Sequence, residues 1–408
     1  MKNKWILCLT CLLVASNGAQ AAGVPEKLTV GAGFENPIGF HDPSPVFSWQ
    51  LPPGTAIQAQ TAFQLVAATR PELLPDKADL WDSGKLASDQ SVWVPYAGAK
   101  LASRRQVYWQ VKVWDQDGRA SDWSSPALFE LGLLENADWD GKWIRNAGAK
   151  PAEVAAKRKI TLEKAVYGVA GEPQLQIDLT EKIQKRFEAG QYAVTANNDF
   201  AGKDPAQGVK KTLIVEYTVD GVRRVEHIDE NRQIALIRKY QFVPQYLRRE
   251  FDLAGDVAQA RLHVTAKGVF EIHLNGQKVG EDFMAPGWTP YRDRIETLTY
   301  DVTSQLKAGA NALGAILGEG WYAGKIVNKP YRYPEAKPAL LLQLEIAYSD
   351  GSAARIVSDG AWTATSNGPI RFSGIFDGEV YDARRELPGW DDVRFDDADW
   401  NGVVTEAV

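Results

Sequence analysis

Apolar and polar residues alternate regularly between Ala260 and Gly324, which predicts strands that bury one face. The expected buried positions are Leu262, Val264, Ala266, Phe270, Ile272 and Leu274. The dipeptide Asn275-Gly276 follows at once, and it suits a two-residue type I′ hairpin because both residues tolerate positive φ. A return strand is expected over Ala312–Leu317. The pattern predicts part of an antiparallel β-sandwich, which we assign to residues 143–144 and 244–400.

Residues 24–133 predict a separate β module. The run Val107–Trp114 alternates in the same way, and the turn sequence Asp115-Gln116-Asp117-Gly118 follows it. Short strands divided by turns at this spacing are typical of a fibronectin type III-like sandwich. Residues 134–151 connect this module to the rest of the chain.

The composition changes at residues 152–242, which contain few tryptophan residues. We predict a small inserted α+β domain there. Strands are expected at 159–165 and 213–219. Between them, a helix is expected with Thr180 as its N-cap, with Ile183 and Phe187 buried on one face and with its end at Gly190. The fold class is therefore mainly β: a fibronectin III-like sandwich, an inserted small α+β domain and a jelly-roll-like β-sandwich.

The first 21 residues are typical of a signal peptide, with Lys2 and Lys4 before a short apolar run and a small-residue cleavage site that predicts a mature start at Ala22. Both cysteines, Cys8 and Cys11, fall in this segment, so the mature chain is expected to lack disulfides and a thiol nucleophile. We therefore expect a periplasmic or secreted protein.

Loss of the two lysines moves the formal net charge from −6 to −8, because residues 1–21 contain no acidic side chain. This charge disfavours nucleic acid and anionic membranes as partners. No later apolar run reaches the roughly 20 residues that a membrane helix needs. We expect a partner that is neither nucleic acid nor membrane.

Several long motifs resemble one family. The motifs LRREF (247–251), LNGQKVGEDFMAPGWTPY (274–291), YDVT (300–303), GEGWYAG (318–324) and GEVYDARRELPGW (378–390) are similar to the N-terminal β-sandwich of bacterial α-L-rhamnosidases, glycoside hydrolase family 78. VYWQVKVWDQDG (107–118) is similar to the fibronectin-like domain that precedes it there. The insert at 152–242 departs from the usual family pattern.

The resemblance implies hydrolysis of terminal α-L-rhamnose from glycosides or polysaccharides by an inverting (α/α)₆ barrel. We find no sequence of that barrel in the 408 residues, and we expect them to have no catalytic residue and no activity alone. The barrel would then act in cis or in trans. The alternative is a stand-alone accessory module that binds rhamnose or another glycan without hydrolysis.

Candidate chemistry within the chain is weak. The carboxylate pairs Glu379 with Asp382 and Asp391 with Asp392, and the cluster Asp396, Asp397 and Asp399, fit turns or at most a weak calcium site. His263 and His273 fall on strands expected to be neighbours, but two histidines do not complete a zinc site. No nucleotide-binding or hydrolase-elbow motif occurs. We predict no metal and no cofactor.

Two aromatic loops are the remaining site candidates, one with Trp288, Tyr291 and Arg292 and the other with Trp321 and Tyr322. Aromatic faces pack against the apolar side of a sugar ring, and Arg donates hydrogen bonds to hydroxyl groups. The same residue types are enriched where protein domains meet. The sequence thus leaves two interpretations of these loops, a carbohydrate site and an interface with the missing barrel.

Overall fold

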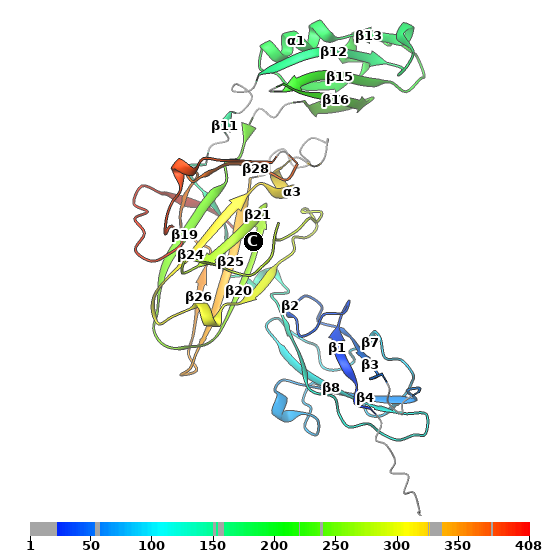
Figure 1. The fold of residues 1–408 in the computed structure, drawn as a ribbon, viewed down its shortest axis with the longest axis vertical. Helices are drawn as coiled ribbons and strands as arrows, with labels where there is room; N and C mark the ends of the chain where they lie inside the picture. Colours follow the sequence, from blue (N-terminus) through cyan, green and yellow to red (C-terminus); the bar gives the residue numbers. More distant parts are fainter. Residues whose placement is uncertain are drawn as a thin grey trace, which may run out of the picture. The chain divides into compact units, whose positions relative to one another are not determined.

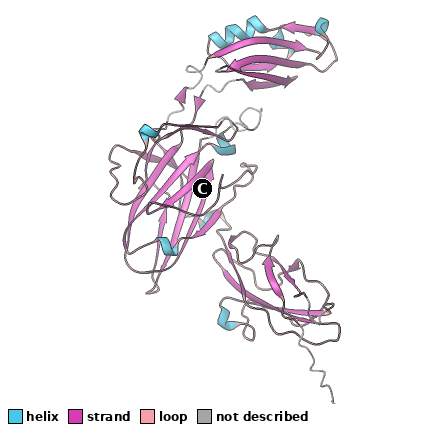
Figure 2. Ribbon diagram, viewed as in Figure 1, coloured by secondary structure: helices cyan, strands magenta, loops and turns pink. Residues whose placement is uncertain are grey.

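The computed structural model describes residues 23–53, 58–149, 152–153, 159–219, 221–236, 240–324, 326, 337–376 and 378–408. The predicted signal peptide, both cysteines and the expected mature start at Ala22 lie outside these residues. The described part is mostly strand with few helices, which confirms the mainly β fold class (Figure 2). The chain divides into two compact units, one up to Leu134 and one from Glu135, and each is described by itself.

The first unit is a two-sheet sandwich. One sheet has the order β1-β3-β7 and the other β2-β9-β8-β4-β5, with β6 beside β4. Their bounds are β1 Glu26–Val30, β2 Ile38–Phe40, β3 Val46–Gln50, β4 Ala62–Ala68, β5 Trp81–Asp82, β6 Leu86–Ala87, β7 Val94–Pro95, β8 Gln106–Trp114 and β9 Ala127–Leu131. The alternation of β8 has the predicted phase, since Val107, Trp109, Val111 and Val113 are buried. The rings of Phe47 and Trp109 meet at 4.6 Å between centroids in the core.

The inserted domain has its own core. A four-stranded antiparallel sheet has the order β13-β12-β15-β16, and helix α1 packs on it (Figure 1). The elements are β11 Ala152–Glu153, β12 Ile160–Gly168, β13 Gln176–Asp178, α1 Thr180–Glu188, β14 Ala193–Ala196, α2 Asn198–Ala201, β15 Thr212–Val219, β16 Val222–Asp229, β17 Arg232–Ala235 and β18 Tyr240–Gln241. Ile183 and Phe187 are buried as predicted.

The start of α1 differs from the prediction. Thr180 is the first helical residue and not the cap, because its hydroxyl is turned to β12, where it accepts a hydrogen bond from the Ala165 N–H at 2.9 Å. Leu179 holds the cap position without a side-chain hydrogen bond, and the Asp178 carboxylate before it accepts a hydrogen bond from the Thr180 N–H.

The second sandwich is one long sheet that curls on itself. Its strand order is β22-β21-β24-β19-β27-β30-β10-β25-β20-β23, with β26 beside β25. The bounds are β10 Trp143–Asn146, β19 Gln245–Leu253, β20 Val257–Lys267, β21 Val269–Leu274, β22 Gln277–Lys278, β23 Leu298–Asp301, β24 Gly309–Gly318, α3 Gly320–Ala323, β25 Ala339–Tyr348, β26 Ala353–Val357, β27 Thr363–Thr365 and β30 Asn401–Glu406. A separate hairpin pairs β28 Ile370–Gly374 with β29 Gly378–Tyr381.

The curl places two layers face to face. Side chains from β19, β21 and β24 share one apolar cluster with side chains from β20 and β25. The predicted buried positions of β20 and β21 all lie in this cluster. The predicted hairpin is also confirmed, since Asn275 and Gly276 have φ of 53° and 79° between β21 and β22. Strand β30 extends the sandwich beyond Trp400, where the sequence pattern had ended it.

Candidate functional site: a groove on the outer face of the sandwich

The structure brings the two predicted aromatic loops into contact. Tyr291 and Tyr322 meet edge to face with 5.2 Å between ring centroids. The five predicted residues of these loops differ in exposure. Trp288 is 54% exposed and Arg292 is exposed, whereas Trp321 and Tyr322 are half-buried in the helical turn α3. Tyr291 is only 8% exposed. Its hydroxyl donates to the Gly287 carbonyl at 2.9 Å, so it braces its own loop and offers no ring face to a ligand.

A groove lies beside these loops on the outer face of the sheet. The strand register aligns Glu271 of β21 with Ile316 of β24, and Ile316 with Tyr246 of β19. Residues aligned across antiparallel strands project from the same face, and the flanking residues Phe270 and Ile272 belong to the core cluster on the other face. Glu271 and Ile316 therefore form one wall of the groove on the side away from the core.

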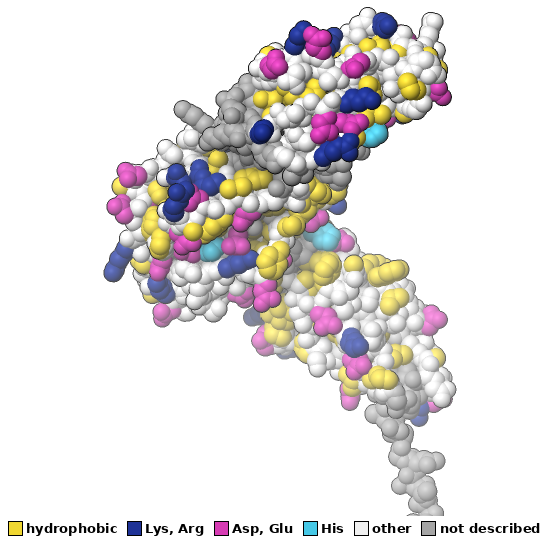
Figure 3. Space-filling model, turned by 45° about the horizontal axis from the view of Figure 1, so that its top comes forward, with side chains coloured by type: hydrophobic (Ala, Val, Ile, Leu, Met, Phe, Trp, Pro, Cys, Tyr) yellow, Lys and Arg dark blue, Asp and Glu magenta, His cyan; other side chains and the backbone are white. Residues whose placement is uncertain are grey.

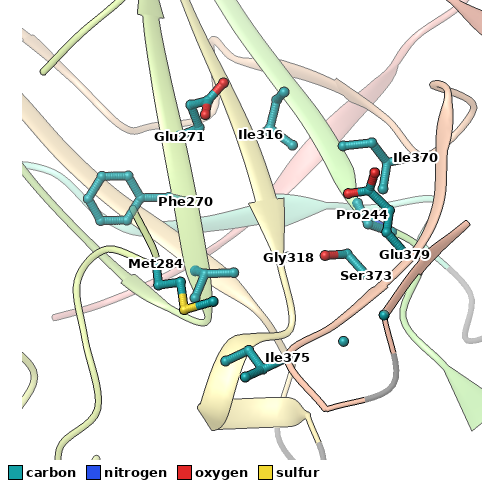
Figure 4. Close-up of a pocket in the computed structure, with 13 residues that line it drawn as sticks. Pro244, Phe270, Glu271, Met284, Ile316, Gly318, Ile370, Ser373, Ile375 and Glu379 are labelled. Carbon is teal, nitrogen blue, oxygen red and sulfur yellow. The ribbon is translucent and has the colours of Figure 1, made fainter. Parts of the chain in front are cut away.

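The β28–β29 hairpin supplies the opposite wall. Glu379 and Ser373 point from the hairpin toward β24 (Figure 4). The groove has a volume of about 340 Å³. Its lining comprises Pro244, Val269, Phe270, Glu271, Met284, Ile316, Gly318, Ile370, Ser373, Gly374, Ile375, Gly378 and Glu379. Most of the lining is apolar, and two carboxylates stand on opposite walls.

Two side chains, His273 and Lys278, hold the Glu271 carboxylate in place. His273 Nε2 is 2.9 Å from one of its oxygens and Lys278 Nζ is 3.0 Å from the other. Burial acts to raise the pKa of Glu271, but the hydrogen bonds from His273 and Lys278 outweigh it and hold that pKa below its usual value. Glu271 is thus an ionised acceptor in a fixed orientation.

Behind Glu271, the His273 ring joins two carboxylates. Its Nδ1 lies 2.6 Å from Asp391 and its Nε2 faces Glu271. A carboxylate only accepts, so both contacts are hydrogen bonds when both ring nitrogens carry protons. Trp390 covers the ring at 5.3 Å between centroids. The chain Asp391–His273–Glu271 links the C-terminal segment to the groove wall.

The expectation that His263 and His273 are on neighbouring strands is wrong. His263 on β20 lies in the ladder with β23 and β25, whereas His273 on β21 lies in the ladder with β22 and β24. The chain crosses from one layer to the other between them, through Gly268 with φ of 141°. His263 Nδ1 lies 2.9 Å from the Thr299 hydroxyl. Over the part of the chain that the structure describes, no three His, Cys, Asp or Glu side chains are arranged to hold a metal ion.

Three of the other candidate carboxylates, Asp382, Asp391 and Asp397, have side-chain partners. Asp382 forms a two-oxygen pair with Arg384, and the Arg384 hydrogen bond lowers the Asp382 pKa to about 2. Asp397 pairs with the buried Arg248, and Asp391 with His273. Of the predicted pairs, only Glu379 lines the groove, and its partner there is Glu271 and not Asp382. Sequence reasoning missed Glu271, although its position on the outward face of β21 was readable from the alternation.

Two regions of the chain match known domain families. Residues 25–135 match a Rha78A-like, N-terminal immunoglobulin domain, an architecture that fibronectin type III domains share. Residues 255–408 match the α-L-rhamnosidase N-terminal domain. The two matches leave the inserted domain between them.

Full-length proteins similar to this chain carry the same family name. An α-L-rhamnosidase of Formosa agariphila is 40% identical over 379 residues, covering 93% of this chain and 32% of the relative. One of Alteromonas sp. is 35% identical, covering 99% of this chain and 36% of the relative. The chain thus spans about a third of the length of these relatives.

Solved structures agree with this. The α-L-rhamnosidase structure from Dictyoglumus thermophilum superposes with a TM-score of 0.67 at 26% identity, over 95% of this chain and 34% of that one. The Streptomyces avermitilis α-L-rhamnosidase complexed with L-rhamnose superposes with a TM-score of 0.66 at 30% identity, over 93% of this chain and 45% of that one.

Proposed function

We propose that this chain, which belongs to the α-L-rhamnosidase family through its two N-terminal domains, is the non-catalytic front part of an exported α-L-rhamnosidase-type glycoside hydrolase. The observation that carries the proposal is that nearly the whole of this chain aligns with only the front part of longer relatives. Relatives named α-L-rhamnosidase match 90% or more of this chain with only about a third of their own length. Hydrolysis of terminal α-L-rhamnose is then performed by a catalytic domain outside these residues, in cis or in trans.

The carboxylates of this chain support a non-catalytic role. Glycoside hydrolysis needs one carboxyl group that stays protonated to assist the leaving oxygen, and such a group has a raised pKa. The pKa values of Glu271 and Asp382 are both lowered, by hydrogen bonds from His273 and from Arg384 respectively. Neither group is suited to act as a general acid near neutral pH.

The surface around the groove supports docking of a further domain. Phe283 is 86% exposed, and five more large apolar residues near the groove and the aromatic loops are also exposed: Met284, Trp288, Phe376, Val380 and Tyr381. Exposed apolar residues grouped in this way mark interfaces with other proteins or domains. Elsewhere, on the face that Figure 3 shows, basic and acidic side chains are interspersed and form no single basic surface.

The second candidate function is a free-standing glycan-binding module. The observation that favours it is the groove, which combines apolar walls with two carboxylates next to the exposed Trp288. A rhamnose-containing glycan is the ligand that the family suggests. Under this alternative the chain retains a sugar and no catalytic domain is required.

One experiment separates these roles. The purified chain is assayed for release of p-nitrophenol from p-nitrophenyl α-L-rhamnoside, and free L-rhamnose is titrated in parallel by tryptophan fluorescence. We expect no release above buffer. Turnover would contradict the non-catalytic role, whereas saturable quenching without turnover would favour the binding module.

Export to the periplasm or the medium is part of the proposal and rests on the first 21 residues. No helix among the described residues is long and apolar enough to cross a membrane. N-terminal sequencing of the protein recovered from the periplasm or medium tests the location. A start at Ala22 is expected, and an intact N-terminus in the cytoplasm would contradict it.

A further inference from the structure

The sheet of the inserted domain ends in an open edge strand. Strand β16, Val222–Asp229, is the last strand in the order β13-β12-β15-β16 and pairs only with β15 among the described residues (Figure 1). With 8 residues it is the longest edge strand in the part of the chain that the structure describes. An edge strand presents unpaired N–H and C=O groups to which another strand can add. This edge also lies outside both regions that match known domain families.

Alternate residues of β16 direct their backbone groups to the open side. The antiparallel ladder with β15 has no bulge along its length, and just beyond it the Glu230 N–H donates to the Lys211 carbonyl on the β15 side. In such a ladder, residues that exchange hydrogen bonds alternate with residues that do not. The even-numbered residues of β16 therefore bond to β15. The backbone groups of Arg223, Val225 and His227 face the open side.

The edge lacks two of the features that usually block strand addition. Natural edges are protected by proline, by bulges and by charges that repel a partner. Strand β16 contains no proline and no bulge, and Val225 near its middle is 39% exposed. Its charges are of both signs, in the order VRRVEHID. Charges of both signs repel only those partners and registers that bring like charges together.

The sequence of β16 is self-complementary in one register. Two copies paired antiparallel are related by a two-fold axis, and because only alternate residues face outward, one residue must lie opposite itself. With 224 on the axis two arginines face each other, and with 226 on the axis two glutamates do. With Val225 on the axis, Arg224 of each copy lies opposite Glu226 of the other. Opposite charges directly across a ladder stabilise it and like charges destabilise it.

The side chains of this register lie on matching faces. Ile228 belongs to the core cluster of the inserted domain, so Arg224 and Glu226 project from the same face of β16 as Ile228. Residues opposite each other in an antiparallel ladder share a face, with Cβ atoms roughly 4.5–5.5 Å apart. Arg223 projects from the other face, where Glu163 and Glu216 already pair with it. It does not compete with Arg224 for Glu226.

From these features we propose that two copies of this chain associate through β16, paired antiparallel with Val225 on the two-fold axis. About six backbone hydrogen bonds and two Arg224–Glu226 pairs join the two four-stranded sheets into one. The contact is short and buries little apolar surface, so the dimer depends on protein concentration. The inference uses only the inserted domain and is independent of the proposed function.

The first test is sedimentation velocity of the purified chain over concentrations from about 1 to about 500 μM, where small interfaces assemble. We expect a reversible equilibrium between monomer and dimer. A chain that stays monomeric over this range would overturn the proposal and leave the edge to a strand of another protein.

The register is tested by exchanging the two charges. Arg224→Glu and Glu226→Arg should each raise the dissociation constant of the dimer about tenfold or more, because each places like charges opposite each other twice. The double variant should regain wild-type association. Lys203→Glu is the matched control, because it makes the same change of charge at an exposed position of the same domain away from β16. A double variant as weak as the single ones, or a control as weak as Arg224→Glu, would refute the register.

The backbone contact is tested with Val225→Pro, which removes an N–H on the open side and no hydrogen bond to β15. We expect the dimer to be lost, and Val225→Thr, which keeps the N–H, to associate within a few-fold of wild type. Thermal unfolding of the same samples separates loss of association from loss of folding. A folded Val225→Pro protein with wild-type association would show that the copies meet elsewhere and would overturn the proposal.

Discussion

Arg248 and the half-buried Asp397 form an ion pair, 2.7 Å from Nη1 to Oδ2, across a sequence separation of 149 residues. Arg248 is only 2% exposed, and its remaining donors reach the Trp390 and Asp392 carbonyls and the Glu250 carboxylate. This single side chain therefore fastens the C-terminal segment to β19. The same segment carries Trp390 and Asp391, which cover and orient His273 behind the groove.

Arg248→Met should destabilise the chain by about 3 kcal/mol, because Asp397 is left without its partner while the carbonyls lose their donor. Urea unfolding measures the change. The control is Arg355→Met. Arg355 is half-exposed and pairs with Asp140 and Glu345, and each of these surface pairs should contribute at most about 1 kcal/mol. Similar losses in the two variants would show that the contacts of Arg248 do not hold the segment.

Gly314→Ala should lower the free energy of unfolding by about 1–3 kcal/mol, because it overpacks the space beneath the covering segment. A Cβ at Gly314 would lie 2.7 Å from the Trp390 ring and 3.1 Å from the Asp391 Cβ, so the covering segment would have to shift. Gly360→Ala is the matched substitution, because a Cβ there meets nothing within 4 Å. Thermal unfolding of both variants measures the difference, and a Gly314→Ala protein as stable as Gly360→Ala would contradict the packing described.

Acid should destabilise the chain partly through Asp397. Burial raises its pKa, but hydrogen bonds from Thr363 and Arg248 outweigh that effect and hold the pKa below the ordinary 3.8. A folded-state pKa below the unfolded one gives stability that is present above about pH 4 and is lost as the pH falls through the folded value. In Asp397→Asn, the free energy of unfolding should be lower than wild type at pH 7 and should fall less steeply below pH 4. Parallel pH profiles for the two proteins would refute this.

Trp288→Ala should leave the free energy of unfolding within about 0.5 kcal/mol of wild type, since Trp288 is 54% exposed. Its effect on function distinguishes the two interpretations of the aromatic loops. If the loop binds sugar, retention on immobilised rhamnose is lost, and if the loop docks a domain, retention is kept while association with a catalytic domain weakens. Trp93→Ala in the first sandwich is the control, because Trp93 is equally a surface tryptophan at 67% exposure. A Trp288→Ala protein that matches this control in both assays would rule out both interpretations.

Much of the local structure of this protein can be predicted from the order of its residues. Alternation identified β8, β20 and β21 with the right residues buried, because a strand with one buried face must repeat with period two. Asn275-Gly276 predicted its hairpin because few other dipeptides adopt positive φ twice at low cost. Long motifs also indicated the family and the position of the insert.

Strand pairing and the contacts between distant side chains become known only from the folded sandwich. Every strand offers the same backbone donors and acceptors, so alternation reveals the buried face but not the neighbour. That is why His263 and His273 were expected side by side although they lie in different layers. Glu271 and Glu379 come together only because the curled sheet and a later hairpin form opposite walls of one groove. The pairing of such distant segments is set by how the whole core packs, which no local pattern encodes.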